Sequence, residues 1–352
     1  MSRRALRTPF LRLAKDGRVI DPARYTRSGG AGAEIGDQVA DDRVLALVAD
    51  GATVVLQGLH RLWPPVIAFA GDLSGDLGHP VQVNAYITPP SSRGFAAHYD
   101  VHDVFVLQLA GEKRWTIHPP VHPLPLRSQP WTDHASTVAA AAIGPPVIDS
   151  VLRPGDALYL PRGYLHAATA LGATSAHLTV GVHALTRYTL VEEVLARAAD
   201  DAELRASLPL GDVGDPGRLR DEWDVVARRL AASLADPPVE RIARRLRERV
   251  AEGVRPAPIA PIAQAAVAAA ITKRTGVRVR PGLRAQLITA GGHRVRLLLG
   301  GRSVTAPDST RPALEALLGG GVHVAGELPG LDEEDGVVLV RRLLREAVVV
   351  PA

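Results

Sequence analysis

The sequence contains no cysteine among its 352 residues. This absence excludes a disulfide framework, thiolate-bound zinc, iron–sulfur clusters and a thiol nucleophile. Any metal that this chain binds must therefore be held by nitrogen and oxygen ligands. The sequence has 12 histidines that could supply the nitrogen ligands.

Lysine and long apolar runs are also scarce. Lysine occurs only at Lys15, Lys113 and Lys273, the other basic residues are arginine, and the formal net charge is +4. Because acidic residues are interspersed along most of the chain, we attribute the arginine excess to composition and not to a nucleic-acid surface. No apolar stretch approaches the ~20 residues of a membrane span, and the first residues lack a secretory signal pattern. We therefore expect a cytoplasmic protein with no membrane partner.

The hydrophobic pattern changes twice along the chain. The first part predicts a helix over residues 41–50, a buried strand over 52–57 and a second helix over 63–73. From residue 81 to 183, short β-type runs separated by Gly/Pro turns predict an all-β sandwich or barrel. Three amphipathic helices follow, and the remainder has the pattern strand, strand, helix, helix, strand. We expect an α+β protein with three domains, over residues 1–185, 186–254 and 255–352.

A histidine and a carboxylate lie two residues apart near the start of the β-type region. If His98 and Asp100 lie on one strand, their side chains project from the same face. A neutral imidazole and a carboxylate, with a second histidine from elsewhere, form the 2-His-1-carboxylate set that binds Fe(II) and leaves positions open. By itself, this spacing is weak evidence, because surface pairs often show it.

The second histidine is predicted in a later segment with the sequence RPGDALYLPRGYLH. Its PGD turn leads into a short apolar strand, and its PRG turn returns the chain so that His166 begins the next strand. His102, His177 and His183 are alternatives for the same position. His102 would lie about 13 Å along the strand from His98, so a ligand from a separate strand closes a compact site more easily. We favour His166, and expect His177 and His183 to line or flank the barrel.

A lysine and a polar strand face are candidates for the surrounding pocket. Lys113 ends the sequence AGEK, which predicts a hairpin turn, and its ammonium could bind a dicarboxylate whose other end chelates the metal. Upstream, VQVNAYIT alternates between apolar and polar residues. Its polar face carries Asn84 and Tyr86, and we expect this face to line a pocket.

Taken together, these motifs resemble those of the JmjC-type ribosomal oxygenases of the cupin superfamily. The motifs that carry the resemblance are NAYITPP, GFAAHYDVHDVFVLQLAGEKRW and PGDALYLPRGYLHAA. The resemblance implies a double-stranded β-helix core, Fe(II) held by His98, Asp100 and His166, and 2-oxoglutarate as co-substrate. It further implies that Lys113 binds the distal carboxylate of 2-oxoglutarate, and that Asn84 and Tyr86 belong to the co-substrate pocket.

The same resemblance implies an activity, partners and an architecture. The enzyme would be a dioxygenase that uses O₂ to hydroxylate a His or Arg side chain of a ribosomal protein. The middle helices would form a homodimer, and the C-terminal part would be a winged-helix-like domain. The apolar stripes of the three helices also favour an oligomer, because they need burial.

Two other functions remain open at this point. The same catalytic core could hydroxylate a small molecule or a natural-product peptide, because a fold does not determine its substrate. Alternatively, the chain could be a non-enzymatic metal-binding cupin whose C-terminal module contacts nucleic acid. The basic helix ERIARRLRERV motivates this last hypothesis, but the last predicted helix opens with acidic residues and argues against it.

Overall fold

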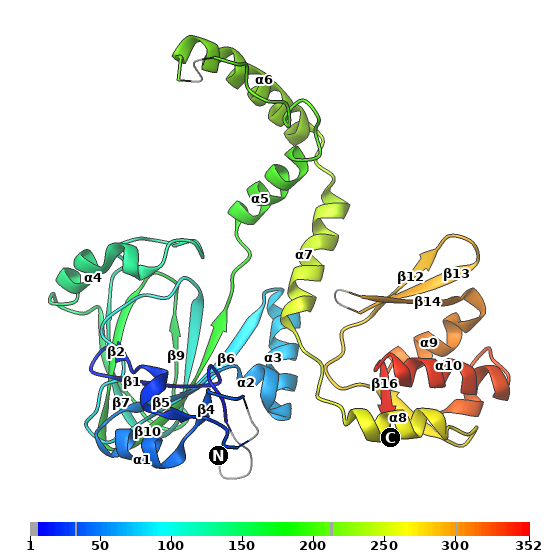
Figure 1. The fold of residues 1–352 in the computed structure, drawn as a ribbon, viewed down its shortest axis with the longest axis horizontal. Coiled ribbons are helices and arrows are strands. Elements are labelled where there is room, and N and C mark those ends of the chain that lie inside the picture. The colour runs from blue at the N-terminus through cyan, green and yellow to red at the C-terminus, as the bar shows by residue number, and fades with distance from the viewer. Residues whose placement is uncertain (1–5, 32–33, 212–213, 300–301) are drawn as a thin grey trace. The chain divides into compact units, whose positions relative to one another are not determined.

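The computed structural model describes residues 6–31, 34–211, 214–299 and 302–352 (Figure 1). The chain divides into two compact units. The first comprises Met1–His183 together with Ala251–Ala352, and the second comprises Ala184–Val250. Within the described residues, no helix is both long and apolar enough to cross a membrane.

An antiparallel sheet in the order β2-β1-β5-β6-β10-β7-β8, with β9 paired to β7, forms the N-terminal core. Its strands are β1 (Leu11–Lys15), β2 (Arg18–Val19), β5 (Thr53–Leu56), β6 (Val81–Thr88), β7 (Asp103–His118), β8 (Ile148–Leu152), β9 (Ala157–Leu160) and β10 (Leu165–Val182). This is the predicted all-β core. A smaller pair, β3 (Thr26–Arg27) with β4 (Gln38–Val39), lies outside this sheet.

The two longest strands, β7 and β10, correct one prediction. The sequence AGEK was expected to form a hairpin turn, but Ala110–Lys113 lie within the continuous strand β7. What is irregular is the pairing of β7 with β10, because their register shifts between Leu171 and Ala176 of β10. Gly111 adopts φ +62°, and the carbonyl of Thr174 occupies the place that a Cβ would take. A glycine there is the signal of a bulge in a long strand, which resembles a turn when read from sequence.

Three short helices cover part of this core. They are α1 (Asp41–Ala49), α2 (Leu59–Leu62) and α3 (Pro64–Leu77). The predicted helices over 41–50 and 63–73 correspond to α1 and α3. Two acidic residues open α1, and a proline opens α3, which are both favourable at a helix N-terminus. One face of α3 packs Val66 and Ala70 against Val83 of β6 and Val180 of β10.

Strand β6 has the alternation that its sequence predicted. Val81 and Val83 belong to the hydrophobic core, whereas Asn84 and Tyr86 line a cavity on the other face. The polar face of β6 therefore looks into the interior of the β-core and not into solvent.

Between β7 and β8 the chain forms a 3₁₀ turn, Trp131–His134, and helix α4 (Ala135–Ala141).

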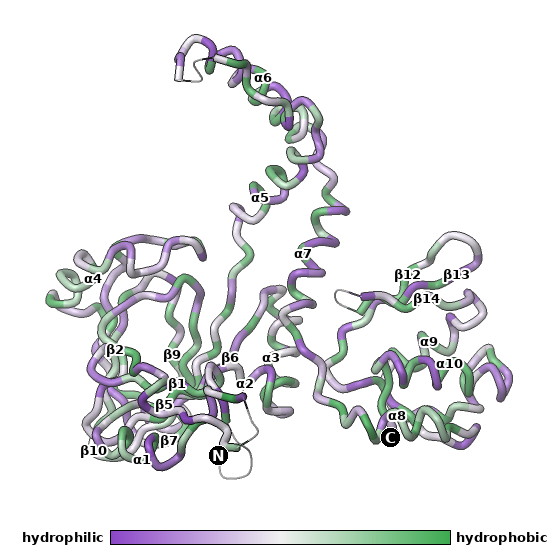
Figure 2. Tube along the Cα trace, viewed as in Figure 1, coloured by the Kyte–Doolittle hydropathy of each residue, from purple (hydrophilic) through white to green (hydrophobic). Residues whose placement is uncertain are grey.

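The second unit contains helices α5 (Arg187–Ala198), α6 (Pro216–Ala235) and most of α7 (Val239–Gly253). A capping box between Thr186 and Thr189 opens α5. The carboxylate of Glu193 is buried and pairs with Arg245 at 2.8 Å and Arg249 at 3.4 Å, which ties α5 to α7. Hydrophilic and hydrophobic residues alternate along α6 and α7 (Figure 2), as expected of amphipathic helices.

The C-terminal part has its own hydrophobic core, whose buried residues lie between Ala268 and Val349. Its elements are α8 (Pro261–Ala269), β11 (Gly276–Val279), β12 (Gln286–Ala290), β13 (Arg294–Leu298), β14 (Ser303–Pro307), α9 (Arg311–Leu318), β15 (His323–Val324), α10 (Glu333–Arg345) and β16 (Val349–Pro351). The sequence pattern missed α8, β14 and the short β15, and it combined β11 and β12 into one strand. Gln264 explains the first omission in part, because this polar residue on α8 is buried and donates to the carbonyls of Leu344 and Val349.

Candidate metal centre

Two histidines and an aspartate come together where β10 begins. The backbones of His98 and His166 form an isolated antiparallel bridge, with N–H···O distances of 2.8 and 3.3 Å. Asp100 follows in an extended segment, where its carbonyl accepts from the N–H of Gly163 at 3.0 Å. The predicted regular strand through His98 and Asp100 is therefore wrong, because only one backbone bridge forms there. The PRG turn before β10 holds the segment in place instead.

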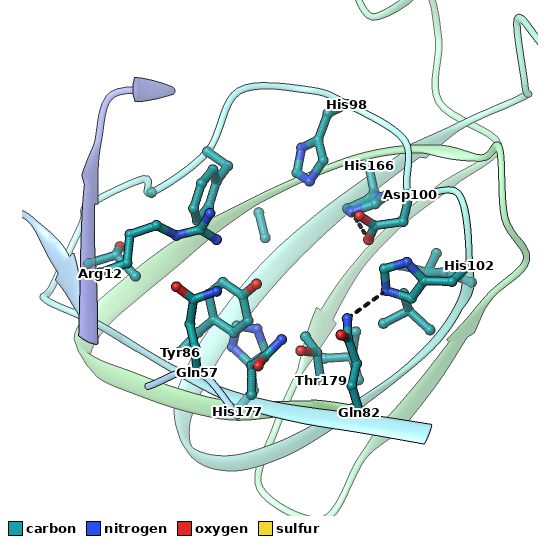
Figure 3. Close-up of a pocket in the computed structure, with 18 of the residues that line it drawn as sticks. Arg12, Gln57, Gln82, Tyr86, His98, Asp100, His102, His166, His177 and Thr179 are labelled. Atoms are coloured by element: carbon teal, nitrogen blue, oxygen red, sulfur yellow. Dashed lines mark hydrogen bonds and ion pairs between the residues drawn. The ribbon is translucent and has the colours of Figure 1, made fainter. Parts of the chain in front are cut away.

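The ligand atoms of His98, Asp100 and His166 all lie within 4.8 Å of one another (Figure 3). Nδ1 of His98 lies 2.7 Å from the carbonyl oxygen of Ala96, and Nδ1 of His166 lies 3.1 Å from that of Tyr164. A carbonyl only accepts, so Nδ1 of each ring carries the proton and Nε2 keeps its lone pair for a metal. Nε2 of His166 is 3.6 Å from Oδ2 of Asp100. Among the described residues, this is the one group of three such side chains with metal-ligand spacing.

The charges at this centre suit a cation. Burial, together with the neighbouring His98, lowers the pKa of His166 to about 4, so the ring is neutral near pH 7. Burial raises the pKa of Asp100, but His166, His98, His102 and His183 oppose it and hold that pKa below its usual value. Neutral imidazoles and an ionised carboxylate are the protonation states that metal binding requires. The donor set therefore fits a divalent metal of the Fe(II) type.

The centre opens into a cavity of about 590 Å³ within the β-core. Lys113 lines this cavity although its side chain is buried, and its Nζ donates to Oγ1 of Thr88 at 3.0 Å. Burial lowers the pKa of Lys113 to about 8. None of the ion pairs found among the described residues includes this ammonium. A buried cation with only a hydroxyl partner is costly, which makes the cavity a good site for an anionic group.

Asn84 and Tyr86 line the same cavity, as the alternation of β6 predicted. Oδ1 of Asn84 accepts from the backbone N–H of Gly58 at 3.0 Å, so part of its amide is used to hold the chain before α2. The ring of Tyr86 stacks on His177, with 5.0 Å between centroids and 4° between planes. Burial raises the pKa of the Tyr86 phenol, and the charge of Asp100 adds to the effect. Tyr86 is therefore a neutral hydrogen-bonding group that faces the metal centre.

The competing histidines have other partners. Nε2 of His102 lies 3.3 Å from the amide nitrogen of Gln82, and its ring stacks on His183 at 4.8 Å. His177 is buried in the cavity wall beside Tyr86. These rings line the barrel, as expected, and do not join the group of three donors.

Several polar residues of the cavity were not identified from the sequence, and three of them are labelled in Figure 3. They are Arg12 on β1, Gln57 just after β5 and Thr179 on β10 (Figure 3). The signal for Arg12 was present, because it interrupts the buried pair Leu11 and Leu13 on a strand whose inner face must be occupied. Only the sheet order shows that this inner face belongs to the metal cavity.

The fold and the donor set indicate the class of protein. A double-stranded β-helix with two histidines and one carboxylate beside its cavity has the architecture of the metal-binding cupins. Residues 73–190 match the family model of the JmjC domain. The chain therefore carries a JmjC domain and is related to the JmjC ribosomal oxygenases, as its motifs predicted.

Sequence relatives support this relationship, and a solved structure shares the fold. The chain is 37% identical over 155 residues to the "Bifunctional lysine-specific demethylase and histidyl-hydroxylase NO66" of Drosophila pseudoobscura pseudoobscura. This alignment covers 42% of this chain and 16% of the relative. It is 33% identical over 203 residues to "Ribosomal oxygenase 1" of Rattus norvegicus, covering 55% and 33%. The chain thus spans no more than a third of the length of either relative. The X-ray structure of E. coli ycfD matches 97% of this chain and 86% of its own, with a TM-score of 0.50 and 18% identity, and so shares the fold.

Proposed function

We propose that the protein is an Fe(II)- and 2-oxoglutarate-dependent dioxygenase that hydroxylates a side chain of a ribosomal protein. The observation that carries this proposal is the combination of the three metal donors with a buried, unpaired ammonium in one cavity. A dicarboxylate that chelates a metal at one end needs a cation at the other. Lys113 supplies that cation.

The residues of the chain have distinct tasks in this proposal. His98, Asp100 and His166 would hold Fe(II), which with 2-oxoglutarate and O₂ supplies the oxidising chemistry. The carbonyls of Ala96 and Tyr164 orient the two imidazoles. Lys113 would bind the distal carboxylate of 2-oxoglutarate, and Asn84 and Tyr86 would form the wall beside it. The enclosed cavity keeps bulk water away from the reacting groups.

The charges of the cavity favour histidine over arginine as the hydroxylated residue. Among its described lining residues, Asp100 is the one carboxylate, and it is committed to the metal. The cationic lining residues are Arg12, Arg61 and Lys113. A guanidinium entering this cavity would meet like charges without a free carboxylate, whereas a neutral imidazole would not. The name of the Drosophila relative, a histidyl-hydroxylase, agrees with this choice.

The proposal is tested on ribosomes from cells that lack the gene. Intact-mass measurement should find one ribosomal protein lighter by one oxygen atom, and peptide sequencing should place the missing hydroxyl on a histidine. Purified protein with Fe(II) and 2-oxoglutarate should restore that mass and form one succinate per hydroxyl. Unchanged masses for all ribosomal proteins would contradict the proposal and favour a small-molecule or natural-product substrate.

We further propose that the protein is a cytoplasmic homodimer joined through its helical unit. Large apolar side chains are exposed on α5 and α6, among them Leu195, Trp223 and Leu234 at 52%, 69% and 59%. Such a face is normally covered by another protein surface. The three helices and small sheets of the C-terminal part support a winged-helix-like module.

Replacing Trp223 by aspartate is expected to convert the dimer to a monomer. A charge at the centre of an apolar interface is left without a partner and costs several kcal/mol of association. Light scattering coupled to size exclusion measures the result. Arg228→Asp, on another face of α6, is the control and should remain dimeric. A monomeric wild-type protein would contradict the dimer.

A further inference from the structure

Two cations of the cavity, Arg12 and the exposed Arg61, bind no group in the function proposed above, and Arg12 is the more buried of the two. Arg12 lies on β1, and its guanidinium points into the cavity toward the side that carries Tyr86 (Figure 3). Its Nε is enclosed and has no hydrogen-bond partner. None of the ion pairs found among the described residues includes it, whereas nearby arginines such as Arg7 and Arg27 pair with carboxylates. Arg12 is therefore a half-buried positive charge without a counterion.

Neutral groups orient this guanidinium without neutralising it. Arg12 is paired in register with Val55, Val55 with Tyr86, and Tyr86 with His177, so all four lie in one row across the sheet. The guanidinium carbon stands 5.2 Å from the centroid of the Phe95 ring, and the charge of Arg12 acts on the phenol of Tyr86 by lowering its pKa. Stacking on an aromatic face fixes the plane of an arginine while leaving its N–H edge free to donate.

The charges of the cavity indicate what the N–H edge of the Arg12 guanidinium would bind. A divalent metal, the carboxylate of Asp100, the ammonium of Lys113 and a dicarboxylate co-substrate together carry no net charge. Arg12 adds one positive charge that the metal centre and the co-substrate leave unmatched, whereas the charge of Arg61, at an exposed position, is screened by solvent. Among the described lining residues, no second carboxylate is present to match it. The matching acceptor must then come from the remaining occupant of the cavity, which is the substrate.

We propose that Arg12 determines substrate binding by donating hydrogen bonds to an oxygen acceptor beside the oxidised residue. This inference rests on the proposed function. The acceptor is either a main-chain carbonyl or a carboxylate of the substrate, and both present the lone pairs that a guanidinium edge recognises. Arg12 is thus a specificity residue and not a ligand of the metal or of 2-oxoglutarate.

The test compares Arg12→Gln and Arg12→Lys with the wild type. The substrate is the ribosomal protein fraction from cells that lack the gene. Loss of a charge-assisted hydrogen bond should raise the KM for this fraction about 10–100-fold in Arg12→Gln, with kcat changed only a few-fold. Arg12→Lys should recover part of the loss. Retention of the same proteins on immobilised cobalt-loaded enzyme with N-oxalylglycine, an isostere of 2-oxoglutarate, should fall in parallel without any turnover.

Two controls separate this role from others. The affinity of the cobalt-loaded protein for 2-oxoglutarate, measured by calorimetry, should be the same in Arg12→Gln and wild type. Arg18→Gln removes an equal charge from an exposed position of the neighbouring strand β2, outside the cavity lining, and should leave the substrate KM within about twofold. Wild-type KM that rises steeply with salt would identify a carboxylate as the acceptor, and a flat response would identify a carbonyl.

Each contrary result has a definite meaning. An unchanged substrate KM in Arg12→Gln overturns the inference, and so does an equal rise in Arg18→Gln, which would reflect overall charge. Weaker binding of the co-substrate by Arg12→Gln assigns Arg12 to the co-substrate site and also overturns it. If the wild type itself hydroxylates no ribosomal protein, the proposed function fails and this inference falls with it.

Discussion

Replacing Asp100 by alanine is expected to abolish Fe(II) binding and to lower kcat/KM by about a thousandfold or more. Histidine ligates a metal through its neutral imidazole, so Asp100 supplies the one negative charge of the donor set. Removal of groups that merely orient a ligand already costs ~10–100-fold in metal affinity or activity, and the loss of an anionic ligand should cost more. Mn(II) binding followed by electron paramagnetic resonance, and succinate formation with Fe(II), measure the two effects separately.

His102→Ala is the matched control for this change. His102 lies two residues from Asp100 and lines the same cavity, but its ring is bonded to Gln82 and stacked on His183. Its removal should leave metal affinity within a few-fold of wild type. Full turnover in Asp100→Ala would refute the ligand assignment, and loss of metal in His102→Ala alone would identify a different donor set.

The metal donors could be predicted because their local sequences are unusual. His98 and Asp100 are two residues apart, and His166 follows a PGD strand and a PRG turn. The donor positions follow from these motifs even though the predicted strand through His98 does not form. Backbone pairing of His98 with His166 replaces that strand and brings the side chains to the same place.

The remaining errors arose where distant contacts decide the structure. Gly111 in AGEK has the local signature of a turn, but pairing with β8 and β10 on either side keeps β7 continuous. Arg12 lies 86 positions before His98 in a strand with no recognisable motif. Its place in the cavity depends on the register of β1 with β5 and of β5 with β6, and sequence periodicity contains no information on strand order.

Helix α8 shows a related limit. Its sequence PIAQAAVAA is rich in alanine and has a small, poorly defined apolar face, so periodicity gave no strong signal. The buried amide of Gln264 is satisfied only by carbonyls at the far end of the chain. The helix is therefore specified by packing against α10 and β16 as much as by its own residues.

Replacing Lys113 by methionine is expected to weaken the binding of 2-oxoglutarate at least about a hundredfold, with a matching rise in the KM for this co-substrate. The loss of one partner of a buried charge pair costs ~2–5 kcal/mol, because the carboxylate would be left without a counterion. Metal binding should be unaffected, since Lys113 is not among the three donors. Calorimetric titration of cobalt-loaded protein with 2-oxoglutarate measures the change, and Lys273→Met, at an exposed lysine, is the control. Unchanged affinity in Lys113→Met would remove this residue from the co-substrate site.

The same substitution should stabilise the ligand-free protein. Burial lowers the pKa of Lys113 to about 8 from its usual 10.5, so folding disfavours the charged form. The unfolded chain then binds more protons than the folded one between about pH 8 and 10.5, and the free energy of unfolding of the wild type rises with pH across that window. Lys113→Met should lack this rise and exceed the wild type most below pH 8, by about 1–3 kcal/mol. Urea unfolding at pH 7 and pH 10 measures both values.

Co-substrate binding should depend on pH with the opposite sign. The distal carboxylate requires the ammonium form of Lys113, so the affinity for 2-oxoglutarate should fall as the pH rises above about 8. Bound 2-oxoglutarate favours the charged form and raises the pKa of Lys113, so the decline should end where the complex itself loses the proton. Lys113→Met should bind 2-oxoglutarate weakly and without this pH dependence. A wild-type affinity that stays constant from pH 7 to pH 10 would show that the buried ammonium is not the group that holds the co-substrate.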